Sequence, residues 1–573
     1  MKSISQATTT SQYLTALRNL NQENKYQATP KLERSPSDRA TEDKVVLSGK
    51  SRSSEDDNFI SVIISTDNPQ KREALLSANA RAKSEHKIPR KVRVDRTLGG
   101  GEVIAKVDKK TIKNLESAGF KVIEDVQDFV LPIFPNRVQC KSKEEKIIPS
   151  VTKESKQGGN QIIDNVAKLA INATTDIDNL TATGRGVSIA ILDTGIAPHP
   201  DIKNKIIAFK DFVNDKEGPY DDNGHGTHVA GDAAGTGATS EGKYKGTAPD
   251  AHIVGVKVLN SDGGAKVSNI VEGIDWVIEN RDKYNIRVIN MSIGVPSPGH
   301  QFDPIDKAVE RAANAGIVVV AAAGNEGPKM GTIGGAPGNS PFALTVGAVD
   351  DKNTVDKSDD EIAPFSSRGP TIDGIVKPDL VAPGTNIISL NIAGSQIDKI
   401  ARSVKHLKEL PDEKLKELPK ELFEGLGLNP AVKEKTPGEI RKYLEKNLPN
   451  INYVDEYYVG MPGTSMAAPI TAGIVADLLE TNPQLSPAQV KDILTKTAND
   501  MGLQKAAQGA GVIDPPEALY KASNLRGELP ESFIALRDNF IASTRNDVFY
   551  ISGSAGGSKV KTDRKSTRLN SSH

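Results

Sequence analysis

Hydrophobic and polar positions divide the chain into a polar N-terminal segment, a small mixed region and a long region of alternating strands and helices. Residues 1–57 are polar, rich in Ser, Thr, Gln and charged side chains, and lack periodicity, so we expect them to be disordered. The pattern changes at the run Phe59-Ile-Ser-Val-Ile-Ile-Ser, which predicts a buried strand. Residues 58–135 are therefore predicted to form a first domain.

The predicted elements of this first domain follow the order β-α-β-β-α-β, which is the ferredoxin-like α+β pattern. After the first strand we expect a helix over 68–85, strands near 92–96 and 101–107, a helix over 108–118 and a strand from Phe120. Many unrelated domains share this order, so by itself it predicts a fold and no function.

A second, larger domain is predicted over residues 161–525. The charged, Ser- and Gly-rich residues 136–160 precede it and indicate an exposed linker, where proteolytic cleavage is easiest. Within the domain, runs such as Val187-Ser-Ile-Ala-Ile-Leu are almost continuously apolar and alternate with helical stretches. This pattern is typical of an α/β fold with three layers, in which helices cover both faces of a mostly parallel central sheet.

One charged segment interrupts the α/β pattern. Residues 391–458 carry many Lys and Glu at helical spacing, with prolines as breaks, and we predict two or three short surface helices there. A solvated decoration, a lid, a flap that shapes the substrate site and a partner surface all remain open as roles for this insertion.

Composition narrows the classes of partner. The 573 residues have a formal net charge of -1, which favours neither nucleic acid nor an anionic membrane surface. The single cysteine, Cys140, allows no intrachain disulfide, and its charged neighbours do not resemble a nucleophile site. No apolar run approaches the ~18 residues of a membrane-spanning helix. No secretory leader follows Met1, so we expect a cytoplasmic or non-conventionally exported protein, with an extracellular place left open.

The end of the chain carries little structural information. Residues 526–562 are expected to begin a C-terminal extension. Residues 563–573 resemble the translation of a common sequencing-adapter oligonucleotide, so we exclude them from the fold, and the natural C-terminus stays undetermined.

Two motifs supply an acid and a base. In Ile191-Leu-Asp-Thr-Gly-Ile, Asp193 ends a buried strand, where a carboxylate is costly unless it is paired. In Asn223-Gly-His-Gly-Thr-His, small residues flank His225, and we expect a helix to begin just after it, near Val229. Histidine is suited to proton transfer near neutral pH, and a buried aspartate holds its tautomer.

A third motif supplies a nucleophile. Ser465 lies in Gly463-Thr-Ser-Met-Ala-Ala-Pro, just before a predicted apolar helix over 467–479. The positive end of a helix dipole favours the anion that forms during acyl transfer. A serine needs a base to remove its proton, and together the three motifs provide one. No Gly-x-Ser-x-Gly elbow surrounds Ser465, which argues against an α/β-hydrolase.

The chain order Asp…His…Ser is that of the subtilisins. From Gly184 to Asp514 the sequence resembles the subtilisin-like (subtilase) family of serine proteases, peptidase family S8, and in pattern it is closest to bacterial members that lack a signal peptide. The resemblance implies a serine endopeptidase that acts on polypeptides, with Asp193, His225 and Ser465 as its catalytic triad.

The resemblance also assigns binding roles. In Ala322-Ala-Gly-Asn-Glu-Gly it implies that the Asn325 amide donates to the oxyanion. It places the substrate beside Ser292, Ile293 and Gly294, and lines the first specificity pocket with Gly294, Ala323 and Gly335. These small residues lead us to expect a roomy pocket with a broad apolar preference.

By the same resemblance, residues 58–135 are a propeptide that inhibits the enzyme from within the chain, with self-cleavage between Val130 and Asn160. The family's calcium loop corresponds to residues 235–246, which lack the expected ligand set, so structural calcium is not supported there, whereas weaker calcium sites elsewhere stay open. We predict no metal ligand, and no cofactor for the chemistry. His199, His228 and Asp379 are expected to be structural.

Two alternatives to an active endopeptidase stay open at this point. The first is a catalytically silent subtilase fold that binds peptides, although the intact motifs count against it. The second is a transpeptidase, which shares the acylation step and differs only in whether water or an amine attacks the acyl-enzyme.

Overall fold

The computed structural model describes residues 59–71, 92–125, 127–129, 182–354, 357–426 and 428–525. The expected disordered segment, most of the predicted helix over 68–85, the linker with Cys140 and all residues beyond 525 lie outside this part of the chain.

The N-terminal described residues form a four-stranded antiparallel sheet with strand order β2-β3-β1-β4. Its central strand β1 buries Val62 and Ile64 against Val103, Ala105 and Val107 of β3. The strands agree with the predicted ones to within a few residues. The bounds are β1 Phe59–Ser65, β2 Val92–Thr97, β3 Val103–Asp108, α3 Lys109–Ser117 and β4 Lys121–Glu124.

The large domain is built on an eight-stranded sheet, with the path β15-β14-β12-β10-β6-β8-β7 and with β16 also paired to β14. All of these pairs are parallel except that of β14 with β15. The predicted α/β fold with a mostly parallel sheet is therefore confirmed. The strands are β6 Ser188–Asp193, β7 Ile206–Asp211, β8 His252–Lys257, β10 Ile286–Met291, β12 Val318–Ala322, β14 Leu344–Asp350, β15 Glu361–Ile362 and β16 Leu380–Pro383.

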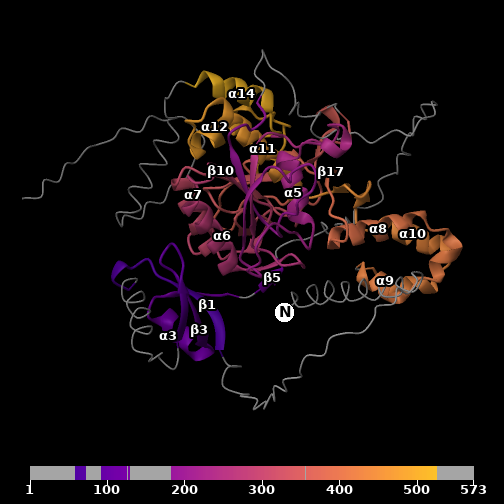
Figure 1. Ribbon diagram of the computed structural model, residues 1–573. Coiled ribbons are helices and arrows are strands. Elements are labelled where there is room, and N and C mark those ends of the chain that lie inside the picture. Colours follow the sequence, from indigo (N-terminus) through magenta and orange to yellow (C-terminus); the bar gives the residue numbers. More distant parts are fainter. Residues whose placement is uncertain are drawn as a thin grey trace, which may run out of the picture. The chain divides into compact units, whose positions relative to one another are not determined.

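Helices cover both faces of this sheet, with α6 and α7 on one side and α5 and α11 on the other (Figure 1). Between its end residues, strand β6 is apolar throughout because each of its two faces packs in a hydrophobic cluster. Ile189 and Ile191 belong to one hydrophobic cluster, whereas Ala190 and Leu192 belong to the other. The helices of the domain are α5 His225–Ala234, α6 Val267–Glu279, α7 Pro304–Asn314, α11 Thr464–Thr481, α12 Pro487–Thr497, α13 Lys505–Gln508 and α14 Pro515–Asn524.

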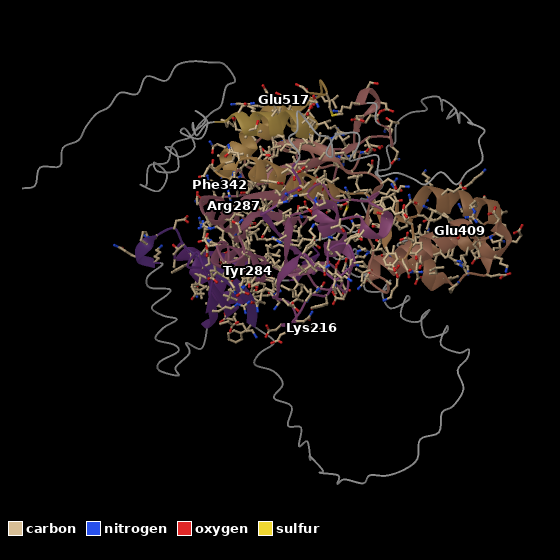
Figure 2. The ribbon with its side chains drawn as sticks, turned by 45° about the horizontal axis from the view of Figure 1, so that its top comes forward. Lys216, Tyr284, Arg287, Phe342, Glu409 and Glu517 are labelled. Carbon is tan, nitrogen blue, oxygen red and sulfur yellow. The ribbon has the colours of Figure 1, made fainter. Side chains whose placement is uncertain are left out.

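The charged insertion forms three α-helices, α8 Gln396–Glu409, α9 Lys420–Gly425 and α10 Pro437–Asn447. Its polar side is exposed, as Glu409 at the end of α8 illustrates (Figure 2). Its apolar side, which includes Ile397, Ile400 and Val404, belongs to the same buried cluster as α5 and α11. The insertion is thus continuous with the core and is more than a solvated decoration.

Short antiparallel pairs complete the domain. The ends of the insertion are joined where β17 Ile387–Leu390 pairs with β19 Tyr458–Met461, which also pairs with β18 Asn452–Tyr453. Strand β11 Val295–Pro296 pairs with β13 Gly335–Ala336, and β5 Gln127–Phe129 pairs with β9 Gly264–Lys266. Among the described residues, none of the helices combines the length and the apolar character that crossing a membrane requires.

Candidate active site

Asp193 and His225 meet at the carboxyl end of β6. The Nδ1 atom of His225 lies 2.8 Å from Oδ1 of Asp193, and both side chains are buried. Helix α5 begins at His225 itself and not near Val229 as predicted. The reason is the Asp221 carboxylate, which accepts hydrogen bonds from the backbone amides of Gly224 at 2.8 Å and Thr227 at 2.9 Å and so supports the first turn.

The electrostatics of this pair favour the imidazolium. Burial alone would lower the pKa of His225, but the charge and hydrogen bond of Asp193 outweigh it and raise the pKa. Asp193 Oδ1 also accepts from the Thr194 amide at 2.7 Å, which fixes the carboxylate in place. The pair can therefore take up a proton at low cost in a site shielded from water.

Ser465 is the second residue of α11, which begins at Thr464 and so earlier than the predicted position 467. Helix α11, which carries Ser465, packs against helix α5, which carries His225. The Ser465 hydroxyl donates to the Ser292 carbonyl oxygen at 3.3 Å, a long contact for a hydroxyl donor. Within the described residues no hydrogen bond joins Ser465 to His225, and such bonds often form only once substrate is bound.

Asn325 is anchored beside the serine. Its Oδ1 atom accepts from the Thr464 amide and from the Thr464 hydroxyl, both at 3.0 Å, so its Nδ2 remains available as a donor. A Cβ built on Gly463 would lie 3.6 Å from the Ser465 amide nitrogen and 3.7 Å from Asn325 Nδ2. The two donors therefore border one small space, which stays open because residue 463 is glycine.

The predicted pocket residues also lie together. Ser292 contacts Ser465 directly, since its hydroxyl donates to the Ser465 carbonyl oxygen at 2.7 Å. Gly335 pairs with Pro296 across β13 and β11, which places it beside the segment that contains Gly294. A Cβ on Gly294 would meet no atom within 4 Å, so this glycine borders open space.

The other two predicted substrate-binding residues, Ile293 and Ala323, contribute differently. The side chain of Ile293 is 2% exposed and packs in the core, so only its backbone can face a substrate. Ala323 directly follows β12, and its amide donates to the Val346 carbonyl oxygen at 2.9 Å, which holds it at the end of the sheet.

The pairing of an extended segment with strand β9 was not predicted from the sequence. Strand β5 of the N-terminal region pairs with it in antiparallel register, with Phe129 opposite Gly264 and Gln127 opposite Lys266. The only local signal was the turn Asn260-Ser-Asp-Gly-Gly that precedes it. A strand of three residues is too short for hydrophobic periodicity to reveal.

The residues expected to be structural are held by several contacts. Both ring nitrogens of His228 have partners, the Asp232 carboxylate at 3.0 Å and the Val459 carbonyl oxygen at 3.1 Å. His199 is 3% exposed, and burial lowers its pKa. Asp379 forms an ion pair with the buried Lys377 at 2.7 Å, and a second pair with Lys491 at 2.9 Å.

The loop at 235–246 does not fit the family's calcium site. Its hydroxyls donate within the protein, since Thr236 binds the Asp201 carbonyl oxygen and Thr239 binds the Asp201 carboxylate, both at 3.0 Å. Its one acidic residue, Glu241, is exposed. In the part of the chain that the structure describes, no group of three or more His, Cys, Asp or Glu side chains could hold a metal ion.

The chain is similar to several known proteins. Residues 184–511 match the profile of the subtilase family of peptidases. Over 320 residues the chain is 44% identical to serine protease AprX of Bacillus subtilis (strain 168), a match that covers 55% of this chain and 61% of AprX. Subtilisin Savinase of Lederbergia lenta is 31% identical over 340 residues, which cover 59% of this chain and 93% of Savinase.

A third relative, M-protease of Shouchella clausii (strain KSM-K16), is 31% identical over 59% of this chain and 66% of its own length. The chain thus spans less than two thirds of AprX and of M-protease. The solved structure of sphericase is 27% identical, with a TM-score of 0.44, over 62% of this chain and 99% of sphericase. Because the family profile covers more than half of the chain, including the motifs around Asp193, His225, Asn325 and Ser465, the chain belongs to the subtilase family.

Proposed function

We propose that this chain is a serine endopeptidase that hydrolyses peptide bonds through an acyl-enzyme on Ser465. The observation that carries the proposal is the buried Asp193–His225 pair, at 2.8 Å, in which His225 begins helix α5, and α5 packs against the helix whose second residue is Ser465. The serine protease AprX, at 44% identity, supports the same activity.

The chemistry follows from the contacts. The Ser465 hydroxyl attacks the carbonyl carbon of the scissile bond while His225 takes its proton. Asp193 stabilises the resulting imidazolium and holds its tautomer. His225 then protonates the departing amine, and water attacks the acyl-enzyme with the same base assistance. Each proton is returned, so the cycle needs no cofactor.

The negative charge of the tetrahedral intermediate falls on the former carbonyl oxygen. Asn325 Nδ2 and the Ser465 amide border the space next to Gly463, where this oxygen would lie. Donors already oriented before the reaction stabilise such a charge without reorganisation.

Polypeptide substrates would bind in extended form, with their backbone paired to β9 on one side and to the segment from Ser292 to Gly294 on the other. The open space at Gly294, next to Gly335, supports a broad preference for large apolar side chains at the first subsite. Profiling of cleavage sites in a peptide library checks this, and a strict preference for a charged residue there would contradict it.

The N-terminal region would act as an inhibitory propeptide, and the enzyme as a zymogen that processes itself. Two contacts support this role. Strand β5 already pairs with the peptide-binding edge β9. The Asp125 carboxylate accepts hydrogen bonds from the amide and the hydroxyl of Ser268, at 3.0 and 2.9 Å.

The test compares the full chain with its Ser465→Ala variant and with Ser403→Ala, a serine in α8, as a control. The parent chain and Ser403→Ala should process themselves and react with a fluorophosphonate probe, whereas Ser465→Ala should do neither, because it lacks the nucleophile. Equal labelling of all three proteins would exclude Ser465 as the nucleophile. Labelling of the parent without processing would support the protease and argue against the zymogen.

A further inference from the structure

The first turn of the insertion binds the loop that leads into His225. We call residues 221–224 the histidine loop. The amide of Gln396 donates to the Asp222 carbonyl oxygen at 3.3 Å, and the amide of Ile397 donates to the Asn223 carbonyl oxygen at 3.0 Å. The first amides of a helix have no partner within the helix. Here α8 uses two of them to hold the histidine loop.

The approach of the two segments is close. A Cβ built on Gly224 would lie 2.7 Å from the Ser395 hydroxyl and 3.3 Å from the Ile397 Cβ atom. Gly224 also has a φ of 104°, a conformation that favours glycine. Residue 224 thus permits both the turn into α5 and the contact with α8.

The same turn of α8 also contacts the edge turn, as we call residues 260–263, which lead into β9. The Gln396 side chain donates from Nε2 to Asp262 Oδ1 at 3.1 Å. Within the edge turn, Asn260 Oδ1 accepts from the amides of Asp262 and Gly264, both at 2.9 Å. A series of hydrogen bonds thus connects Gln396 with Gly264, the first residue of β9.

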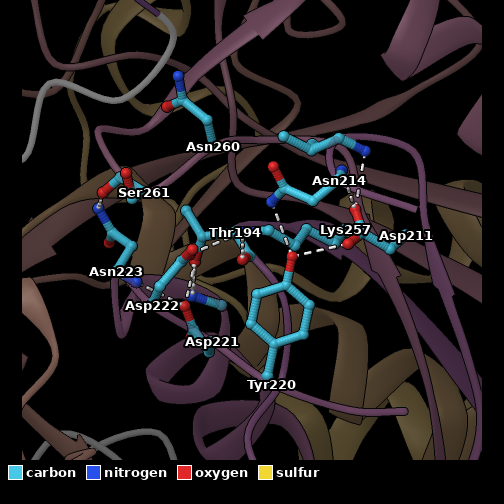
Figure 3. Close-up of polar contacts among 12 residues, drawn as sticks. Thr194, Asp211, Asn214, Tyr220, Asp221, Asp222, Asn223, Lys257, Asn260 and Ser261 are labelled. Carbon is cyan, nitrogen blue, oxygen red and sulfur yellow. Dashed lines mark hydrogen bonds and ion pairs between the residues drawn. The ribbon is translucent and has the colours of Figure 1, made fainter. Parts of the chain in front are cut away.

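The histidine loop is also hydrogen-bonded directly to the edge turn, without the help of α8. Asn223 donates from Nδ2 to the Ser261 carbonyl oxygen at 2.7 Å, and its Oδ1 accepts from the His225 amide at 3.1 Å (Figure 3 shows Asn223 beside Ser261). Asp222 is held in turn by an ion pair with Lys257, at 2.8 Å. Gln396 thus adds a second connection between histidine loop and edge turn, and this one comes from the insertion.

We propose that Gln396 is a positioning residue for the proposed peptidase site, which sets the spacing between β9 and the loop that carries His225. This inference rests on the proposed function only for its kinetic consequence. Peptides long enough to pair with β9 would depend on Gln396. A single-residue ester, which reaches only the first subsite, would not. The insertion thereby acquires a role in the recognition of extended substrates.

Kinetics on the processed enzyme test this consequence. In Gln396→Ala, KM for a tetrapeptide amide should rise about three- to tenfold, the effect of one lost hydrogen bond, with kcat unchanged. KM for the single-residue ester should stay constant. His406→Ala, an exposed residue of the same helix, is the matched control and should match the parent on both substrates. Equal changes on both substrates, or none, would overturn the proposal.

Exchanging the hydrogen-bond donor and acceptor between positions 396 and 262 separates a positioning role from a merely structural effect. Gln396→Glu places a carboxylate against Asp262 and should raise KM for the tetrapeptide further, since two like charges then face each other. Adding Asp262→Asn gives the new glutamate a donor and should restore the parent KM. If the double variant does not recover the parent KM, the contact between positions 396 and 262 does not position β9.

Hydrogen exchange supplies a readout that needs no activity. In the full chain carrying Ser465→Ala, the amides of the edge turn and of β9 should exchange about three- to tenfold faster after Gln396→Ala, and should be unchanged after His406→Ala. Unchanged exchange would overturn the positioning role even if the chain hydrolyses peptides. Faster exchange, combined with a parent chain that hydrolyses no peptide, would uphold the positioning role and contradict only the proposed function.

Discussion

At the scale of single residues, the candidate site contains polar side chains whose orientation is set by a hydrogen bond to a neighbouring residue. Asn325 illustrates this, because Thr464 takes both hydrogen bonds at Oδ1 and thereby sets the direction of Nδ2. The Asp193 carboxylate similarly accepts from Thr194 and contacts His225 through the same oxygen. Groups oriented in this way lose little entropy when the substrate arrives.

Asn325→Ala tests the oxyanion role. The change removes one donor to the developing charge, so kcat should fall by about 10²–10³, a magnitude carried over from a related subtilisin. KM should change little, because the donor acts mainly in the transition state. Steady-state kinetics on a peptide amide measures both constants.

The matched control is Asn429→Ala, which removes the same side chain from a helix cap in the insertion. It should leave kcat and KM as they are. A variant at position 325 that raised KM at constant kcat would show that Asn325 binds the ground state and does not stabilise the oxyanion.

At the scale of elements, the proposed base and nucleophile lie in the first turns of two buried helices that pack together. Both α5 and α11 begin earlier than their hydrophobic patterns predict, so that His225 and Ser465 fall within the first helical turns. Hydrophobic periodicity in a sequence indicates where the apolar face of a helix begins. Such periodicity does not reveal a capping residue such as Asp221, whose carboxylate accepts hydrogen bonds from the amides of Gly224 and Thr227.

A buried ion cluster ties several elements of the sheet together. Burial would raise the pKa of Asp379, but the positive charges of Lys377 and Lys491 outweigh it and lower the pKa. Asp379 also accepts from the Thr345 amide of β14 at 2.7 Å. Breaking such a cluster by removing one partner would leave an uncompensated buried charge. This explains why a charged residue beside β16 is compatible with the core.

At the scale of the whole molecule, the N-terminal sheet is held on helices α6 and α7 by both apolar and polar contacts. Ile63, Leu98 and Ile104 belong to the same buried cluster as the apolar sides of these helices. Asp125 accepts two hydrogen bonds from Ser268, in the first turn of α6, whose own N-cap residue makes no side-chain cap. One region of the chain thus caps a helix of the other.

Asp125→Ala tests this contact in the full chain with Ser465→Ala, which prevents self-cleavage. A hydrogen bond to a charged acceptor contributes about 1.5–3 kcal/mol, so the Ser268 amide should exchange about 10- to 100-fold faster. Amide hydrogen exchange followed by mass spectrometry or NMR measures the rate. Glu124→Ala, the exposed preceding residue at the end of β4, is the control and should leave the rate unchanged. Equal protection in both variants would show that Asp125 does not hold the two regions together.

The sequence by itself determined the α/β class, the motifs and the family, because apolar runs and short contiguous motifs are local properties of the chain. It also placed the strands of the N-terminal sheet to within a few residues. Only the tertiary structure decided that β9 pairs with β5, that the insertion continues the core, and that Gln396 lies between the histidine loop and the edge turn. These facts depend on contacts between residues far apart in the chain, such as Gln396 and Asp262, and no local pattern of polarity encodes such a pairing.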